Sequence, residues 1–171
     1  AEVVVPGDPS SAAFLACAAL LKPQSHITIE NVSLNTARIG FTRTLERMGA
    51  DISVHYSGAA GKEPYGSIEV RYTPLLRGCE IPADKIASIV DEIPVLSLVA
   101  AHARGVTIFR EVSELRVKET DRLVEIMNGL EKLGVDAWVE GNDLYIEGQP
   151  DLQTQPGLVF ESHGDHRLAM T

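Results

Sequence analysis

The feature that most constrains the fold is an internal repeat. The segment RTLERMGADISV (43–54) matches NGLEKLGVDAWV (128–139) at a leucine, a glutamate, a base, a large apolar residue, a glycine, a small aliphatic residue and an aspartate. Self-similarity of this kind is typical of a supersecondary unit that occurs more than once and stacks on its own copies. The repeat therefore predicts an architecture built from copies of one α/β unit.

The match extends outward and defines the unit as β-α-β-α-β-β. In the first copy, the expected elements are a strand at 2–5, a helix over PSSAAFLACAALL (9–21) with Ser10 or Ser11 near its start, a strand at 26–32, a helix at 38–48, and two strands at 51–56 and 67–72. Gly49 is expected to end the second helix, because glycine best tolerates the left-handed conformation of a C-terminal cap. The segment GAAGKEPYG (58–66) is expected to connect the last two strands.

The second copy repeats this order. Its expected elements are a strand over CEIP (79–82), a helix over PVLSLVAAHA (94–103) opened by Asp91, a strand at 105–112, a helix that starts at Thr120 or Asp121 and ends at Gly134, and strands at 135–140 and 143–148 joined by Gly141-Asn142. In the second of these two helices, one face carries the apolar residues Leu123, Ile126, Met127, Leu130 and Leu133. A third copy begins at GLVFESHGDHRLAMT. The predicted units are about 1–75, 76–150 and a truncated 151–171.

Composition excludes several classes of function. The net charge of −9 argues against non-specific binding to nucleic acid, which requires a basic face. There is no run of 18 apolar residues and no secretory signal at the N-terminus, so no membrane partner is expected. Cys17 and Cys79 have no CxxC or zinc spacing, which predicts a reducing, cytoplasmic compartment. The chain opens inside a strand-like run and stops within a helical pattern, as expected for part of a longer protein.

Each unit places an aspartate at or beside the start of its first helix: Asp8, Asp91 and Asp165. One interpretation is that these carboxylates are N-caps, which accept hydrogen bonds from free backbone N–H groups. For Asp91 a catalytic role is the competing interpretation. If the units pack around a local axis, their helix starts converge and form a positive region even in an acidic protein.

The segment RVKETDRL (116–123) concentrates charge at a predicted helix start. A solvated helix start would explain it by local ion pairs, each worth only about 0.2–0.5 kcal/mol. The alternative is that Lys118 and Arg122, four residues apart on one side of the helix, hold an anion beside Glu119. In SHGDHRLAM, the histidines His163 and His166 have loose spacing for a metal, so Arg167 is better interpreted as an anion ligand. These groups suit acid–base chemistry on a small anionic substrate but do not identify the reaction.

Five strings in order carry a resemblance to a known family: VPGDPSSAAF, LNTARIG, DEIPVL, ELRVKETDRL and SHGDHRLAM. Together they resemble the 5-enolpyruvylshikimate-3-phosphate synthases, over nearly the whole chain. The resemblance implies an inside-out α/β fold, with βαβαββ units packed so that their helices lie inside, and one lobe of a two-lobed enzyme. It implies enolpyruvyl transfer from phosphoenolpyruvate to the 5-hydroxyl of shikimate 3-phosphate, with release of phosphate and with no metal or organic cofactor.

The resemblance also implies roles for individual residues. Asp91 would take the proton of the 5-hydroxyl, and Glu119 would protonate the methylene of phosphoenolpyruvate and later recover that proton. Lys118 would bind shikimate 3-phosphate, whereas Arg122 and Arg167 would bind phosphoenolpyruvate. Asp8 and His166 are secondary candidates, and no residue is assigned to a metal.

The family pattern is incomplete in this chain. The sequence lacks the family's N-terminal Lys-Ser-…-Arg segment, its C-terminal lysine and its other lobe, which is the expected partner. Glu114 stands where some members have asparagine. The isolated chain is therefore expected to be inactive. Two alternatives are a lobe of a UDP-sugar enolpyruvyl transferase and a non-catalytic repeat domain that binds small anions.

Overall fold

The computed structural model describes residues 5–153 and 156–171 and has a mixed α/β fold with two sheets. The first sheet contains β1 (His26–Ser33), β2 (Asp51–Ala60) and β3 (Glu63–Arg71), all antiparallel, in the order β1-β3-β2. The second contains β4 (Glu80–Ile81), β5 (Gly105–Phe109), β6 (Ala137–Glu140) and β7 (Asp143–Gly148) in the order β4-β5-β7-β6. Only the β4–β5 pair of this described sheet is parallel.

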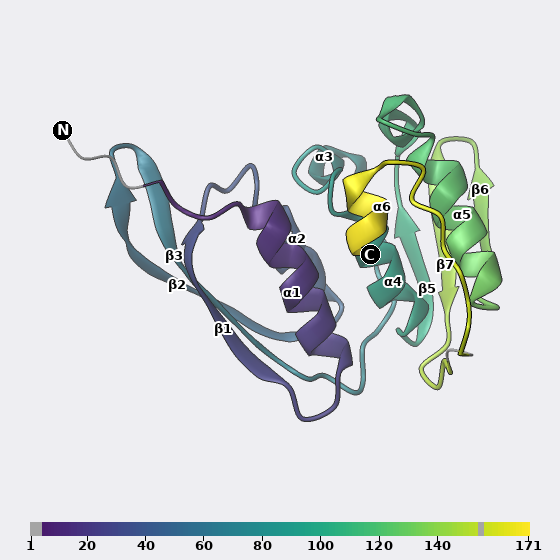
Figure 1. Ribbon diagram of the computed structural model, residues 1–171, viewed down its shortest axis with the longest axis horizontal. Coiled ribbons are helices and arrows are strands. Elements are labelled where there is room, and N and C mark those ends of the chain that lie inside the picture. The colour runs from purple at the N-terminus through teal and green to yellow at the C-terminus, as the bar shows by residue number, and fades with distance from the viewer. Residues whose placement is uncertain (1–4, 154–155) are drawn as a thin grey trace.

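Two apolar helices fill the space between the sheets. Helices α1 (Pro9–Leu21) and α4 (Ile93–Ala101) are buried on nearly every side and contact each other. Helix α1 packs on β1 and β3, while α4 packs on β7 (Figure 1). A helix that is apolar all round has to be surrounded by protein, and the many alanines of α1 allow its neighbours to approach closely. The helices that the sequence makes most apolar therefore form the core.

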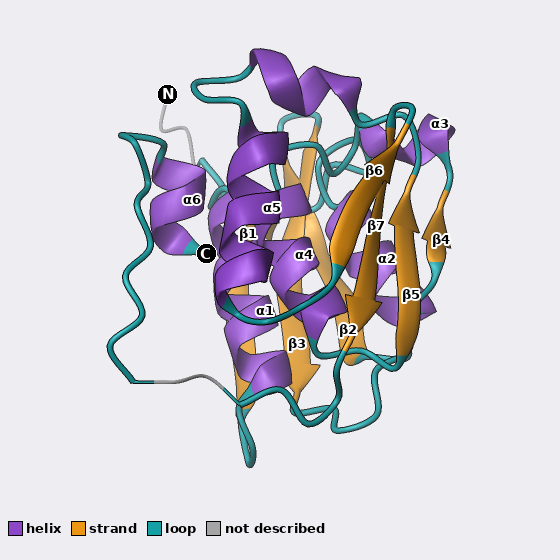
Figure 2. Cartoon of the chain, turned by 90° about the vertical axis from the view of Figure 1, so that its right-hand side faces the viewer, coloured by secondary structure: helices purple, strands orange, loops and turns teal. Residues whose placement is uncertain are grey.

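The remaining helices are amphipathic or short. Helices α2 (Gly40–Arg47) and α5 (Arg122–Lys132) each bury one face, and α5 lies beside α4 against the second sheet (Figure 2). Shorter helices are α3 (Ala83–Ile86), the 3-10 helix η1 (Ser113–Val117) and α6 (His166–Met170). Among the described residues, no helix has the length and apolar character that crossing a membrane requires.

Most predicted elements occur in the structure. The apolar face of α5 is confirmed, with Leu123, Ile126 and Leu130 buried and with Met127 and Leu133 packed at its edge. The tight turn at 141–142 and the strands on either side of it are also confirmed. The strand expected at 2–5 falls mainly on residues 1–4, which lie outside the described residues.

Three boundaries differ from the prediction. The connection expected at 58–66 is wrong: β2 and β3 continue through it and turn only at Gly61-Lys62, where Gly61 has a φ of +66°. The strand expected to reach residue 112 ends at Phe109, because the chain turns at Glu111, whose φ is +53°. Helix α2 starts two residues late, after a turn at 36–38, and α3 was not predicted.

Gly148 and Gly129 provide a matched test of this packing. A Cβ on Gly148 would overlap the carbonyl oxygens of Ala100 and Ala103, whereas a Cβ on Gly129 would meet nothing within 4 Å. We expect Gly148→Ala to lower the free energy of unfolding by about 1–3 kcal/mol, as overpacking does. Gly129→Ala should raise it by about 0.5–1 kcal/mol, because glycine is a poor helix former. Urea unfolding of both variants measures this, and equal midpoints would contradict the tight contact between β7 and the end of α4.

Candidate functional site

The starts of four helices meet on one side of the molecule. Helix α4 contacts α1, α5 and α6, and Figure 1 shows α6 close to α4. The N-cap residues are Asp8 for α1, Asp121 for α5 and Asp165 for α6, and each accepts a hydrogen bond from a backbone N–H of its helix. The predicted convergence of helix starts is therefore present, and it concentrates positive ends of helix dipoles in one region.

Arg122 is the centre of this region. Its side chain is 1% exposed and contacts three carboxylates from three segments. The Arg122 Nε donates to Asp165 Oδ2 at 2.7 Å, Nη1 donates to Asp91 Oδ1 at 3.0 Å, and Nη2 donates to Glu119 Oε2 at 2.6 Å. One guanidinium thus joins the turn before α4, the start of α5 and the cap of α6.

Arg122 and Asp165 form an ion pair in which both side chains are buried and both are ionised. Burial opposes the charge of each group, but the hydrogen bonds and the opposite charge outweigh it. As a result the pKa of Arg122 lies above its ordinary value. The pKa of Asp165 lies below its ordinary value, because Arg122 and the backbone N–H of Arg167 both stabilise its carboxylate. Such a pair holds its geometry well, since loss of either partner would leave a buried charge alone.

Asp91 is the group that the other cations share. Lys118 Nζ lies 3.7 Å from Asp91 Oδ1 and also pairs with Glu114 Oε1 at 2.9 Å. Arg167 Nη2 lies 4.0 Å from Asp91 Oδ2. The Asp91 side chain is 38% exposed, so it faces solvent at the rim, unlike the buried Asp165.

The five principal residues predicted from the sequence therefore form one cluster: Asp91, Lys118, Glu119, Arg122 and Arg167. Two local expectations were wrong. Asp91 does not open α4, which starts at Ile93 after a preceding turn. Lys118 does not project from α5, because it lies in extended backbone at the end of η1, so its place beside Asp91 results from the loop rather than from helical spacing.

The two secondary candidates differ in their surroundings. Asp8 is the N-cap of α1: it accepts from the backbone N–H of Ser11 at 2.9 Å and pairs with Arg38 at 3.1 Å. Burial raises the pKa of Asp8, but the Ser11 hydrogen bonds outweigh this and lower it overall. His166 is exposed at the first position of α6, and its side chain has no hydrogen-bond partner among the described residues. A role for His166 stays a prediction.

Comparison with known proteins identifies the family. The family model described as "EPSP synthase (3-phosphoshikimate 1-carboxyvinyltransferase)" matches residues 1–171. The chain belongs to the EPSP synthase family. It is 44% identical to the 3-phosphoshikimate 1-carboxyvinyltransferase of Geobacillus thermodenitrificans over 169 residues, covering 99% of this chain and 39% of that protein. It is 46% identical to the enzyme of the same name from Acidiphilium cryptum, covering 100% of this chain and 38% of that protein.

A solved structure supports the same family at the level of the fold. The EPSP synthase of Acinetobacter baumannii matches with a TM-score of 0.91 and 35% identity, covering 98% of this chain and 39% of that one. The chain therefore spans about two fifths of the length of the EPSP synthases that it matches.

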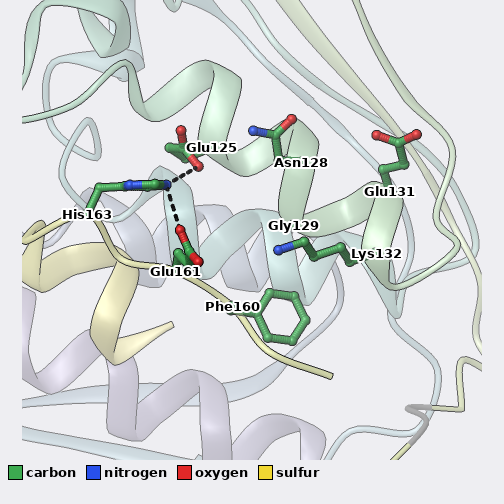
Figure 3. Close-up of a pocket in the computed structure, with 8 residues that line it drawn as sticks. All are labelled: Glu125, Asn128, Gly129, Glu131, Lys132, Phe160, Glu161 and His163. Carbon is green, nitrogen blue, oxygen red and sulfur yellow. Dashed lines mark ion pairs between the residues drawn. The ribbon is translucent and has the colours of Figure 1, made fainter. Parts of the chain in front are cut away.

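The site of this EPSP synthase chain is an open rim rather than a closed pocket. A cavity of about 410 Å³ lies between α4, α5, α6 and the segment 160–162, and a neighbouring hollow of about 270 Å³ lies over α5. Figure 3 shows the hollow, where His163 points toward Glu125 and Glu161 at 3.5 and 3.8 Å. The charged cluster lines neither of them. Across residues 5–153 and 156–171, no group of three or more His, Cys, Asp or Glu is arranged to hold a metal ion.

Sequence reasoning missed two members of the site. Asp165 was interpreted as a helix cap, yet it also accepts two hydrogen bonds from the buried Arg122 guanidinium. Glu92 follows Asp91 and is 3% exposed, and burial raises its pKa above the ordinary value. A glutamate directly before the apolar run IPVLSLVAA was the available signal, because nearly every residue of that helix is buried.

Replacement of Arg122 by an apolar residue tests the buried cluster. We expect Arg122→Met to lower the free energy of unfolding by about 3–5 kcal/mol at neutral pH, because Asp165 would be left as a buried charge without a partner. In the wild type, the stabilisation from Asp165 is present above the ordinary pKa of 3.8 and is lost as the pH falls through its lowered folded value. The difference between the variant and the wild type should therefore shrink in acid.

Urea unfolding at neutral pH and below pH 3.8 measures this difference. The control is Lys85→Met, which removes an exposed ion pair with Asp84 and should change little. A deficit in Arg122→Met that stays constant with pH would show that the Arg122–Asp165 pair is not the source of the stability.

Proposed function

We propose that this chain is one lobe of an EPSP synthase and that it supplies the phosphoenolpyruvate side of the active site. On this proposal the lobe consists of βαβαββ units at about 1–75 and 76–150, followed by the start of a third at 151–171, with the helices inside. The order α-β-α-β-β occurs in both α1–β3 and α4–β7, which supports the division into units. The protein acts in the cytoplasm, consistent with the unpaired thiols of Cys17 and Cys79.

The observation that carries the function is the environment of Asp91. This half-exposed carboxylate has Arg122, Lys118 and Arg167 within 4.0 Å, and Glu119 shares the Arg122 guanidinium with it. Two carboxylates and three cations at one rim provide both a base and an acid, together with positive charge for an anionic substrate. This set suits the addition of a hydroxyl to phosphoenolpyruvate, which carries a carboxylate and a phosphate.

The proposed steps use only these side chains. Asp91 accepts the proton of the 5-hydroxyl of shikimate 3-phosphate while that oxygen bonds to C2 of phosphoenolpyruvate, and Glu119 donates a proton to the methylene carbon. The resulting tetrahedral intermediate loses phosphate as Glu119 recovers a proton from the methyl group, which restores the double bond. No metal or organic cofactor takes part. Lys118 binds shikimate 3-phosphate, and Arg122 and Arg167 bind and orient phosphoenolpyruvate.

Binding of the substrate changes the partners of the arginines. In the structure, Arg122 Nη2 donates to Glu119 Oε2 at 2.6 Å. An anionic substrate that takes over part of this guanidinium releases the Glu119 carboxyl from Arg122, so that it becomes free to contact the substrate. The same contact that binds the substrate thus prepares the acid.

The catalytic roles are tested in the complete two-lobed protein by neutral, isosteric replacements. We expect Asp91→Asn and Glu119→Gln each to lower kcat by about 10²–10⁴-fold, the usual contribution of a general acid or base. Glu131→Gln, at the exposed far end of α5, is the matched control and should leave kcat unchanged. Steady-state release of phosphate measures the rates. Normal kcat in both site variants would leave only a binding role and would favour the non-catalytic repeat domain.

The partition of the active site is tested with the 171-residue chain alone. We expect it to show negligible phosphate release with both substrates, because the remaining contacts to shikimate 3-phosphate belong to the other lobe. The complete protein, assayed in parallel, is the control. Turnover by the isolated chain comparable to that of the complete protein would refute the assignment of this chain to half of the site.

A further inference from the structure

Glu92 is a buried acid without a matching partner. Its side chain is 3% exposed, and its Oε1 has no hydrogen-bond partner among the described residues. It occupies the N-cap position of α4, yet its side chain makes no capping hydrogen bond. An ionised carboxylate buried in this way is expensive unless it is paired, so the position favours a neutral carboxyl.

The groups around Glu92 come from three other segments. Ser10 at the start of α1 is 1% exposed, and its Oγ accepts from Arg38 at 3.3 Å. Burial raises the pKa of Glu92, and the neighbouring charge of Asp91 raises it further. A hydrogen bond with Ser10 and the charges of Arg167 and Arg38 lower the pKa, but they do not outweigh burial. Burial raises the pKa of the Cys17 thiol in α1, and the charge of Glu92 adds to this effect. Glu92 is buried next to Asp91 at the start of α4, and α4 contacts both α1 and α6.

Arg167 is the least satisfied cation of the same rim. Its side chain is 11% exposed, its buried Nε has no hydrogen-bond partner among the described residues, and its contact with Asp91 is 4.0 Å long. Arg38, Lys118 and Arg122 each have a carboxylate oxygen at 3.1 Å or closer. Arg167 thus keeps its charge available for a ligand, and Glu92 is a nearby acid that could compensate that charge if it ionised.

We propose that Glu92 controls the charge available at Arg167, so that a small carboxylate or phosphate anion binds there with the Glu92 carboxyl neutral. Glu92 is a positioning residue, because its buried carboxyl acts on the ligand through Arg167 and does not touch the ligand. The identity of the ligand as phosphoenolpyruvate rests on the proposed function, but the coupling between Glu92 and an anion does not.

The coupling has a defined sign. If the anion binds better when Glu92 is neutral, then the bound anion must also favour the neutral form of Glu92, because linkage between two binding events is reciprocal. Affinity for the anion should therefore be highest at low pH and should fall as the pH rises through the titration of Glu92. A glutamine at this position mimics the neutral acid and should remove the effect.

Sulfate is a suitable first probe, because its charge stays constant over the range in which a carboxyl titrates. For the complete protein, calorimetric titration should show that affinity for sulfate falls as the pH rises above 4.5, the ordinary pKa of a glutamate, by about 5–150-fold if the coupling is of the usual size. Glu92→Gln should bind at the low-pH affinity of the wild type throughout this range. Phosphoenolpyruvate, titrated in the same way, should give the same difference between the two proteins.

Three results would overturn the proposal. Glu92→Gln could retain the pH dependence of the wild type, or it could bind sulfate more weakly at every pH, which would mean that the charge of Glu92 supports binding. Sulfate could also bind Arg167→Gln as tightly as the wild type, which would place the anion elsewhere. Glu131→Gln is the control and should behave as the wild type does.

A measurement on the wild type keeps the test valid if Glu92→Gln fails to fold. The ¹³C chemical shift of the Glu92 carboxyl, followed against pH, should show a higher pKa with sulfate than without it, and an unchanged pKa would refute the coupling. This result is independent of enolpyruvyl transfer. A protein with the coupling but without turnover would refute the proposed function alone, and an active enzyme without the coupling would refute this inference alone.

Discussion

The ion pair between Arg122 and Asp165 is the contact on which the arrangement of the rim depends. Both side chains are buried and meet at 2.7 Å, and they join the start of α5 to the cap of α6 across 43 positions of the sequence. Because the same guanidinium also binds Asp91 and Glu119, the positions of both proposed catalytic carboxylates follow from where this one side chain is held. A buried ion pair contributes little net stability compared with apolar packing, but it fixes geometry.

Apolar helices make this arrangement possible in an acidic protein. Helices α1 and α4 are buried between two sheets, so their N-terminal ends reach the same side of the molecule as those of α5 and α6. The dipoles of these ends favour negative charge, which suits the capping aspartates and also an anionic substrate. The net charge of −9 therefore does not prevent a local region that attracts anions.

The sequence was informative wherever local chemistry decides the structure. The periodicity of α5, the glycine turn at 141–142 and the capping aspartate of α1 could all be predicted, because each depends on neighbouring residues. The extent of the β2–β3 hairpin could not be predicted, since Gly58, Pro64 and Gly66 are also turn signals and only the pairing of β2 with β3 makes them strand residues. The cluster of acids and arginines was expected from the family motifs. The pairing within the cluster could not be predicted, because packing decides which carboxylate faces which guanidinium.

The structure distinguishes two arginines that the motifs treat alike. Arg122 is 1% exposed and its charge is matched by three carboxylates, so a substrate can reach it only by displacing Glu119 or Asp91. Arg167 has no carboxylate closer than 4.0 Å among the described residues, and its buried Nε has no hydrogen-bond partner among them. On the proposed function, we expect the first contact of an incoming anion to be with Arg167, and contact with Arg122 to follow with the release of a carboxylate. In this order, substrate binding would precede and cause the release of the proposed acid, Glu119, from Arg122, and would thereby couple the chemistry to occupancy of the site.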